Sequence, residues 1–146
     1  MILFVERTKN KKGESYVALP RQTANGFDLM VARDITLKKG KLAKINLGVK
    51  IYIPKGFQAL ITPKNGNAEF YSLCLADMPI RKFNSDKCEE WSVYGMPLND
   101  IIIKKGDRIA SFQMLPKINA NLAQKLQWLF SKKWKVVEVE DINDVK

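Results

Sequence analysis

Short runs in which apolar and polar side chains alternate dominate the chain. The alternation is clearest at 27–32 and 49–53, and a period of two is typical of strands with one buried face. Turn-forming glycine, proline and asparagine separate such runs. Short strands at this spacing predict an all-β sandwich or barrel. The other expected strands are 1–7, 58–62, 71–75, 90–94, 101–103, 108–115 and 134–140.

The segment 121–132 breaks this alternation, because its apolar residues recur at helical spacing. Pro116 closes the preceding strand, and either Asn119 or Asn121 is the candidate N-cap. We expect one amphipathic helix here whose apolar face covers the domain's own core. A contact with another subunit or a partner protein is the alternative. The apolar residues of this face are Leu122, Leu126, Leu129 and Phe130.

The length of 146 residues suits one domain, 1–146, with one core. No stretch approaches the roughly 20 apolar residues of a membrane span. The opening residues become charged too soon for a signal peptide. We therefore expect a cytoplasmic protein without a membrane partner, found in the host cytoplasm or the virion if the source is a virus.

The chain contains no histidine, which excludes Ser-His-Asp and Cys-His catalysis. Cys74 and Cys88 are its two cysteines, whereas a structural zinc site needs about four ligands. We expect both to be reduced and structural. Acid–base chemistry would have to come from carboxylates, lysines or a metal-bound water.

The formal net charge is +10, which favours polyanionic partners. The lysines are scattered along the chain, however, and no aromatic-interleaved nucleic-acid motif stands out. The distribution favours a solvated basic surface over a functional anion site, and it supports a nucleic-acid partner only weakly.

Four segments occur in the order in which one known family carries its motifs. They are 24–29 (Ala-Asn-Gly-Phe-Asp-Leu), 47–57, 62–66 (Thr-Pro-Lys-Asn-Gly) and 103–110 (Ile-Lys-Lys-Gly-Asp-Arg-Ile-Ala). Together they resemble the trimeric dUTPase family. The resemblance implies a dUTPase-like β-sandwich of jelly-roll type, with one added C-terminal helix, assembled as a homotrimer. It also implies hydrolysis of dUTP to dUMP and pyrophosphate with Mg²⁺.

The resemblance assigns roles to residues of motifs one, two and four. Asp28 matches the acidic residue that supports the metal-bound phosphates, and Ser111 replaces the glutamine that follows the fourth motif's alanine. In motif two, lysine and asparagine replace arginine and serine, and lysine lacks the two-pronged grip of arginine. The phosphate-binding candidates of motif two are Lys64, Asn65 and Gly66. The motif-four residues expected to be structural are Gly106, Asp107 and Arg108.

The third motif, which carries the catalytic carboxylate in the family, can be aligned in two ways. The favoured alignment puts Asn84 at the catalytic aspartate and Lys87 at the tyrosine. Asparagine cannot take a proton from water. The other alignment puts Asp77 at the catalytic carboxylate and Arg81 at the motif's arginine.

The fifth motif, a glycine-rich arm, is not found, since no glycine follows Gly106. From these substitutions we predict a homotrimer that has lost catalysis, holds no cofactor, and serves as a binding, structural or regulatory protein. The lysine-, asparagine- and isoleucine-rich composition favours a viral or phage origin. The alternative is a divergent active dUTP diphosphatase that uses Asp28 and Asp77 with Mg²⁺. A third hypothesis is a basic module that binds nucleic acid or protein through helix 121–132.

Overall fold

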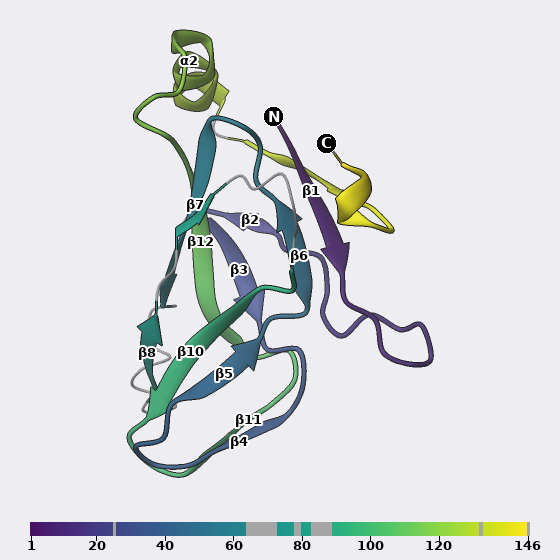
Figure 1. Ribbon diagram of the computed structural model, residues 1–146, viewed down its shortest axis with the longest axis vertical. Helices are drawn as coiled ribbons and strands as arrows, with labels where there is room; N and C mark the ends of the chain where they lie inside the picture. The colour runs from purple at the N-terminus through teal and green to yellow at the C-terminus, as the bar shows by residue number, and fades with distance from the viewer. Residues whose placement is uncertain (25, 64–72, 78–79, 83–88, 132, 146) are drawn as a thin grey trace.

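The computed structural model shows strands wrapped around one cluster of buried side chains, with a helix at one end (Figure 1). It describes residues 1–24, 26–63, 73–77, 80–82, 89–131 and 133–145, with only the backbone described for 73–77, 80–82 and 131. Within these ranges no helix is long and apolar enough to cross a membrane.

The largest sheet has five strands in the order β2-β3-β12-β7-β9. Its longest strand, β12, runs through the middle and is antiparallel to both β3 and β7. Central strands are paired along both edges, so this sheet is the rigid platform of the molecule. Its members are β2 (Gln22–Thr23), β3 (Gly26–Met30), β12 (Arg108–Pro116), β7 (Phe57–Pro63) and β9 (Ile80–Lys82).

Three smaller sheets have the strand orders β13-β1-β6, β5-β10-β8 and β11-β4. The sheets β5-β10-β8 and β11-β4 lie toward the end of the molecule opposite the helix (Figure 1). Their strands are β1 (Ile2–Arg7), β4 (Ile35–Leu37), β5 (Ala43–Asn46), β6 (Val49–Tyr52), β8 (Leu73–Asp77), β10 (Ser92–Pro97), β11 (Ile101–Ile103) and β13 (Lys135–Glu138).

The core follows from the alternation along the strands. Phe27 and Leu29 of β3 and Phe112 of β12 are at most 1% exposed. The rings of Phe27 and Phe112 stack at 4.9 Å, and Trp91 meets Phe112 edge-on at 5.1 Å. The opposite face of the same strands carries polar side chains, so one period-two pattern both builds the core and lines the outer face.

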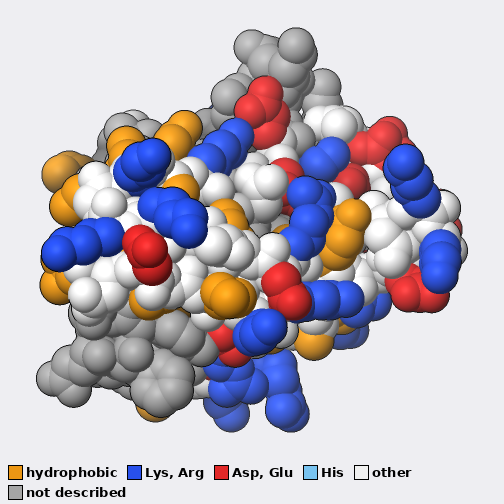
Figure 2. Space-filling view, turned by 90° about the horizontal axis from the view of Figure 1, so that it is seen from below, with side chains coloured by type: hydrophobic (Ala, Val, Ile, Leu, Met, Phe, Trp, Pro, Cys, Tyr) orange, Lys and Arg blue, Asp and Glu red, His pale blue; other side chains and the backbone are white. Residues whose placement is uncertain are grey.

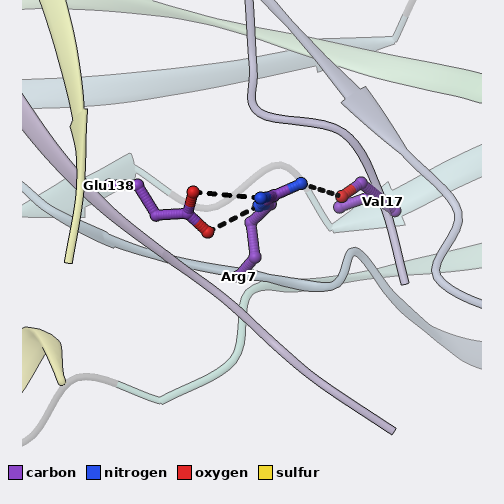
Figure 3. Close-up of polar contacts among 3 residues, drawn as sticks. All are labelled: Arg7, Val17 and Glu138. Atoms are coloured by element: carbon purple, nitrogen blue, oxygen red, sulfur yellow. Dashed lines mark hydrogen bonds and ion pairs between the residues drawn. The ribbon is translucent and has the colours of Figure 1, made fainter. Parts of the chain in front are cut away.

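The two ends of the chain lie beside each other, because β1 pairs in parallel with β13. Arg7 of β1 donates two hydrogen bonds to the carboxylate of Glu138, at 2.7 and 3.0 Å, and a third to the carbonyl of Val17 at 3.3 Å (Figure 3). After β13 the short 3-10 helix η1 (Ile142–Asp144) buries Ile142 to 1% exposure.

Helix α2 (Leu122–Ser131) occupies the segment for which a helix was predicted. Asn121 is its N-cap: the Asn121 side chain accepts from the backbone N–H of Gln124 at 2.8 Å, and the Gln124 side chain accepts from the Asn121 N–H at 3.1 Å. This reciprocal pair is a capping box. The prediction that the helix covers the core with its apolar face is wrong, since Leu122 and Phe130 are 72% and 81% exposed.

The structure confirms the predicted all-β class with one late helix. Several strands that the pattern did not predict are present: the two-residue β2, and β4 and β5, which lie in a lysine-rich stretch where alternation is hard to see. The strand predicted at 90–94 begins two residues later, at Ser92. Trp91 instead exchanges backbone hydrogen bonds with Leu47 and Val49. Cys74 is in β8, and Cys88 lies outside the described residues.

Candidate functional site

A row of polar side chains crosses the outer face of the five-stranded sheet. In register, Ser111 of β12 lies opposite Asp28 of β3 on one side and Thr62 of β7 on the other. The hydroxyl oxygens of Thr62 and Ser111 are 3.5 Å apart, and Ser111 is 8% exposed. Three neighbouring strands therefore bring one carboxylate and two hydroxyls together on a rigid surface.

Arg108 closes one end of this row. Its guanidinium lies 3.4 Å from the Asp28 carboxylate, and the two side chains are 56% and 13% exposed. Asp28 is thus held in place on the sheet, while much of the Arg108 cation stays open to solvent and to an incoming anion.

A β-bulge makes this arrangement possible. The register of β12 against β3 shifts between Arg108 and Ala110, so Ile109 is the additional residue. Strict alternation would put Arg108 and Ser111 on opposite faces, whereas a bulge lets two consecutive residues point inward. Ile109 and Ala110 are both buried, at 1% and 0% exposure, and both Arg108 and Ser111 consequently reach the side of Asp28.

The turn before β12 fixes where the row begins. The Asp107 carboxylate accepts from the backbone N–H of Lys104 at 3.0 Å, and Gly106 has φ +86°. The N–H of Gly106 donates to the carbonyl of Val31, and the Val31 N–H donates to the carbonyl of Asp107. Gly106 and Asp107 therefore tie the turn to the end of β3, next to the row.

Gly26 sets how closely β3 approaches β12 at the other end of the row. It has φ +113°, and a Cβ built on it would overlap the carbonyl oxygen of Phe112, with the carbonyl carbon only 3.0 Å away. Only glycine fits this backbone approach without a shift. Because Asp28 is two residues along the same strand, the glycine also determines the position of its carboxylate.

A pocket of about 260 Å³ opens beside this end of the row, lined among others by Gly26, Gln113, Trp128 and Trp134. Pockets that hold whole small molecules span about 300–1,000 Å³. A nucleoside triphosphate therefore exceeds this pocket of a single chain.

The other predicted site residues are not brought into the described row. Lys64, Asn65 and Gly66, which follow β7 directly, and Asn84 and Lys87 all lie outside the described residues. Asp77 ends β8, opposite Tyr94 of β10, whereas Arg81 is in β9, opposite Ala59 of β7. The backbones of Asp77 and Arg81 thus belong to two different sheets, and both alignments of motif three stay predictions.

Two features of the site were missed in the sequence. Thr62 was seen only as part of motif two, and its place next to Ser111 follows from the pairing of β7 with β12. Arg108 was expected to be structural, and its ion pair with Asp28 depends on the bulge. For Thr62, the one available indication in the sequence was a threonine that faces outward at the end of β7.

At one end of the molecule, positive charge has no single focus. Figure 2 views the end formed by β4, β5, β10 and β11, and it shows blue Lys and Arg side chains between red carboxylates and orange apolar side chains. Such mixing is typical of a solvated basic surface. Among the described residues, no cluster of three His, Cys, Asp or Glu side chains could hold a metal ion by itself.

Comparison with known proteins identifies the family. The family model described as dUTPase matches residues 15–127. A deoxyuridine 5′-triphosphate nucleotidohydrolase of Rickettsia prowazekii is 34% identical over 110 residues, which are 70% of this chain and 74% of the relative. The SPbeta prophage-derived deoxyuridine 5′-triphosphate nucleotidohydrolase YosS of Bacillus subtilis is 29% identical over 97 residues, 64% of this chain and 68% of that protein.

Solved structures support the same fold. The dUTPase of Staphylococcus bacteriophage 80alpha with dUPNHPP superposes with a TM-score of 0.67 at 18% identity, covering 82% of this chain and 85% of that one. A point mutant of the dUTPase of phage phi11 of S. aureus superposes with a TM-score of 0.67 at 16% identity, covering 84% and 95%. The matching family model, the curated relatives and the shared fold together place this chain in the dUTPase family.

Proposed function

We propose that the chain is a divergent dUTP diphosphatase, which hydrolyses dUTP to dUMP and pyrophosphate as a cytoplasmic homotrimer of single-domain subunits. Relatives named deoxyuridine 5′-triphosphate nucleotidohydrolase support the substrate. The prophage-derived relative and the phage structures support a phage origin. Membership of the dUTPase family supports the homotrimer.

The observation that carries the proposal is Asp28, kept at its motif position and held on the outer face between Arg108 and Ser111. Hydrolysis of a triphosphate requires that its developing negative charge is neutralised and its phosphates are oriented. The half-exposed guanidinium of Arg108 and the hydroxyls of Ser111 and Thr62 supply a cation and hydrogen-bond donors in one row. Lys64, which follows β7 in sequence, would add a second cation.

The donor set suits Mg²⁺ that arrives with the substrate. Mg²⁺ prefers oxygen ligands and is commonly held by one or two carboxylates together with substrate phosphates. The described row offers one carboxylate, Asp28, which would hold the ion indirectly, through its water. The bound ion would neutralise phosphate charge. The chain's own residues would orient the triphosphate against the sheet.

The attacking water still needs a base, and Asp77 is the carboxylate that the second alignment of motif three provides.

A second candidate function follows from the first alignment. With Asn84 in the position of the base and Lys87 in that of the tyrosine, the chain would bind the nucleotide without hydrolysing it. It would then be a binding or regulatory protein on the same scaffold.

One set of variants separates the two. Pyrophosphate release from dUTP with Mg²⁺ is measured for the wild type, Asp77→Asn, Asn84→Asp and Asp28→Asn. Glu140→Gln, an exposed carboxylate in the described C-terminal segment, is the control. If the chain is an active enzyme with Asp77 as base, the wild type releases pyrophosphate. Asp77→Asn should lower the rate of release at least a hundredfold, and Glu140→Gln should leave the rate unchanged.

Absence of turnover in the folded wild type refutes the diphosphatase proposal. If Asn84→Asp then gains turnover, the chain is a nucleotide-binding protein that lost its base at position 84. The affinity for a non-hydrolysable dUTP analogue is measured in parallel by titration. Asp28→Asn is expected to weaken binding of this analogue in either case.

A further inference from the structure

Two hydroxyl groups of the polar row face each other across neighbouring strands. Thr62 of β7 lies directly opposite Ser111 of β12, and their hydroxyl oxygens are 3.5 Å apart. An ordinary O–H···O hydrogen bond is about 2.7–2.8 Å long, so the two groups hold each other only weakly. Among the described residues, neither hydroxyl has a second hydrogen-bond partner. Both protons can therefore turn to a stronger acceptor.

The strands fix the positions of both hydroxyl oxygens before any ligand arrives. Ser111 belongs to a central strand that is paired along both edges. On the inner face of the sheet, the sequence neighbours Ile61 and Phe112 are both 0% exposed. Thr62 is β-branched and precedes Pro63, which restricts both its side-chain rotamer and its backbone. Donors held in this way bind a ligand without the usual cost of ordering them.

The separation of the two hydroxyls suits a single acceptor atom placed between them. An oxygen that lies about 2.8 Å from each hydroxyl oxygen completes a triangle with an angle of about 77° at the acceptor. The two hydroxyl oxygens are too far apart to be adjacent ligands of Mg²⁺, which at about 2.1 Å from the ion would be about 3.0 Å apart in an octahedron. The geometry therefore favours one shared oxygen acceptor over a directly bound metal ion.

The burial of Ser111 limits what can reach its hydroxyl. The residue is 8% exposed, so only a small opening leads to this donor. A non-bridging phosphate oxygen projects from a tetrahedral group, and its negative charge strengthens the hydrogen bonds that it accepts. The low dielectric around a buried donor strengthens them further. A phosphate oxygen is therefore well matched to this position.

The charged side chains beside the two hydroxyls decide which anion can approach. Asp28 lies opposite Ser111 on the other side, and its carboxylate repels an anion. The Arg108 guanidinium lies 3.4 Å from that carboxylate and offsets its charge, while 56% of the Arg108 side chain stays exposed. An anion that brings its own divalent cation meets less repulsion at Asp28. The row therefore favours a phosphate chain loaded with Mg²⁺ over a free anion.

We propose that Thr62 and Ser111 form one two-hydroxyl clamp, which grips a single non-bridging oxygen of the metal-bound phosphate chain. The clamp rests on the proposed function for its ligand, a Mg²⁺-bound nucleoside triphosphate. Thr62 is thereby a residue that positions the phosphate chain. Each hydroxyl holds the shared oxygen in place for the other, so the two donors contribute as a unit. Removing either one should cost most of the affinity that both provide.

The test measures affinities for two ligands by titration calorimetry with Mg²⁺: a non-hydrolysable dUTP analogue, and inorganic tripolyphosphate, which has no base or sugar. Thr62→Val removes one hydroxyl and keeps the side-chain shape, whereas Thr62→Ser keeps the hydroxyl. Thr62→Val and Ser111→Ala should each weaken binding of both ligands by about tenfold or more, as expected for a hydrogen bond to a charged group. Thr62→Ser should stay within about threefold of the wild type, and the double variant within about threefold of the weaker single variant.

Thr36→Val is the matched control, because Thr36 is an exposed threonine of β4, which belongs to a different sheet. It should bind both ligands like the wild type, and urea unfolding verifies that each variant is folded. Ser111→Ala carries the decision if Thr62→Val does not fold. Unchanged affinity in the variants that lack a hydroxyl overturns the clamp. So do losses that multiply in the double variant, or a loss in Thr62→Ser equal to that in Thr62→Val.

The two ligands also separate failure of the clamp from failure of the proposed function. Turnover of dUTP by the wild type, together with unchanged affinities in the hydroxyl variants, overturns the clamp and leaves the diphosphatase standing. Hydroxyl-dependent binding of both ligands without turnover supports the clamp and refutes the diphosphatase. A wild type that binds neither ligand overturns both.

Discussion

The close contact at Gly26 makes one substitution especially informative. Gly26→Ala adds a methyl group at φ +113°, where it overlaps the carbonyl oxygen of Phe112 in β12. Gly40→Ala is the matched control, since Gly40 also has a positive φ, +72°, but nothing lies within 4 Å of the added Cβ. The pair separates backbone strain from the steric effect of the strand approach.

The magnitudes follow from these two environments. A positive φ costs an L-residue roughly 1–2 kcal/mol, which is the whole effect expected for Gly40→Ala. At Gly26 the added Cβ also forces apart two strands, and β12 cannot retreat because β7 pairs with its other edge. Overpacking costs typically 1–3 kcal/mol, and a weakened ladder hydrogen bond about 1 kcal/mol. We expect Gly26→Ala to lower the free energy of unfolding by roughly 3–6 kcal/mol.

Urea unfolding followed by tryptophan fluorescence measures both variants, and Trp91 next to Phe112 reports on the core. Since Asp28 is two residues from Gly26 on the same strand, Gly26→Ala should also weaken binding of a dUTP analogue under conditions in which it is folded. Free energies of unfolding for the two variants that agree within about 1 kcal/mol would refute the steric argument.

Two further predictions concern the chain ends and the helix attachment. The hydrogen bond from Arg7 lowers the pKa of the Glu138 carboxyl. The stabilisation by this ion pair is therefore present above the usual carboxyl pKa and lost as the pH falls through the lowered one. Glu138→Gln should make the free energy of unfolding less dependent on pH in this acid range. At pH 7 the substitution should lower the free energy of unfolding by less than about 1 kcal/mol, because both side chains are partly exposed. Trp128→Phe removes the donor to the Met114 carbonyl, and should lower the free energy of unfolding by about 1–2 kcal/mol in the same urea titration; an unchanged value would mean that α2 is held by other contacts.

The fold was largely predictable where side chains alternate. The runs around Phe27 and Ile51 predicted β3 and β6 because each strand buries one face. The parallel pairing of β1 with β13 was not predictable, since registers between distant segments leave no local pattern. The spacing in 121–132 predicted a helix with an apolar side correctly, but spacing does not say what that side faces.

The candidate site was predictable as a set of motif residues and not as an arrangement. Asp28 and Ser111 were both singled out, yet their adjacency requires the pairing of β3 with β12. The ion pair of Arg108 with Asp28 requires the bulge at Ile109, one additional residue that the sequence does not distinguish from a regular strand. Register and bulges are set by the packing of whole strands. Local sequence patterns therefore identify the site residues but do not predict how they are arranged.

The pairing of β1 with β13 has a consequence for synthesis of the protein. Arg7 and Glu138 are 131 residues apart, so β1 leaves the ribosome long before its parallel partner exists. At 5–20 residues per second the delay is on the order of ten seconds. During that time β6 can occupy one edge of β1, while the other edge remains an unpaired template. Such an open edge, on a strand whose Leu3 and Val5 are fully buried in the finished fold, is a site at which the nascent chain can aggregate.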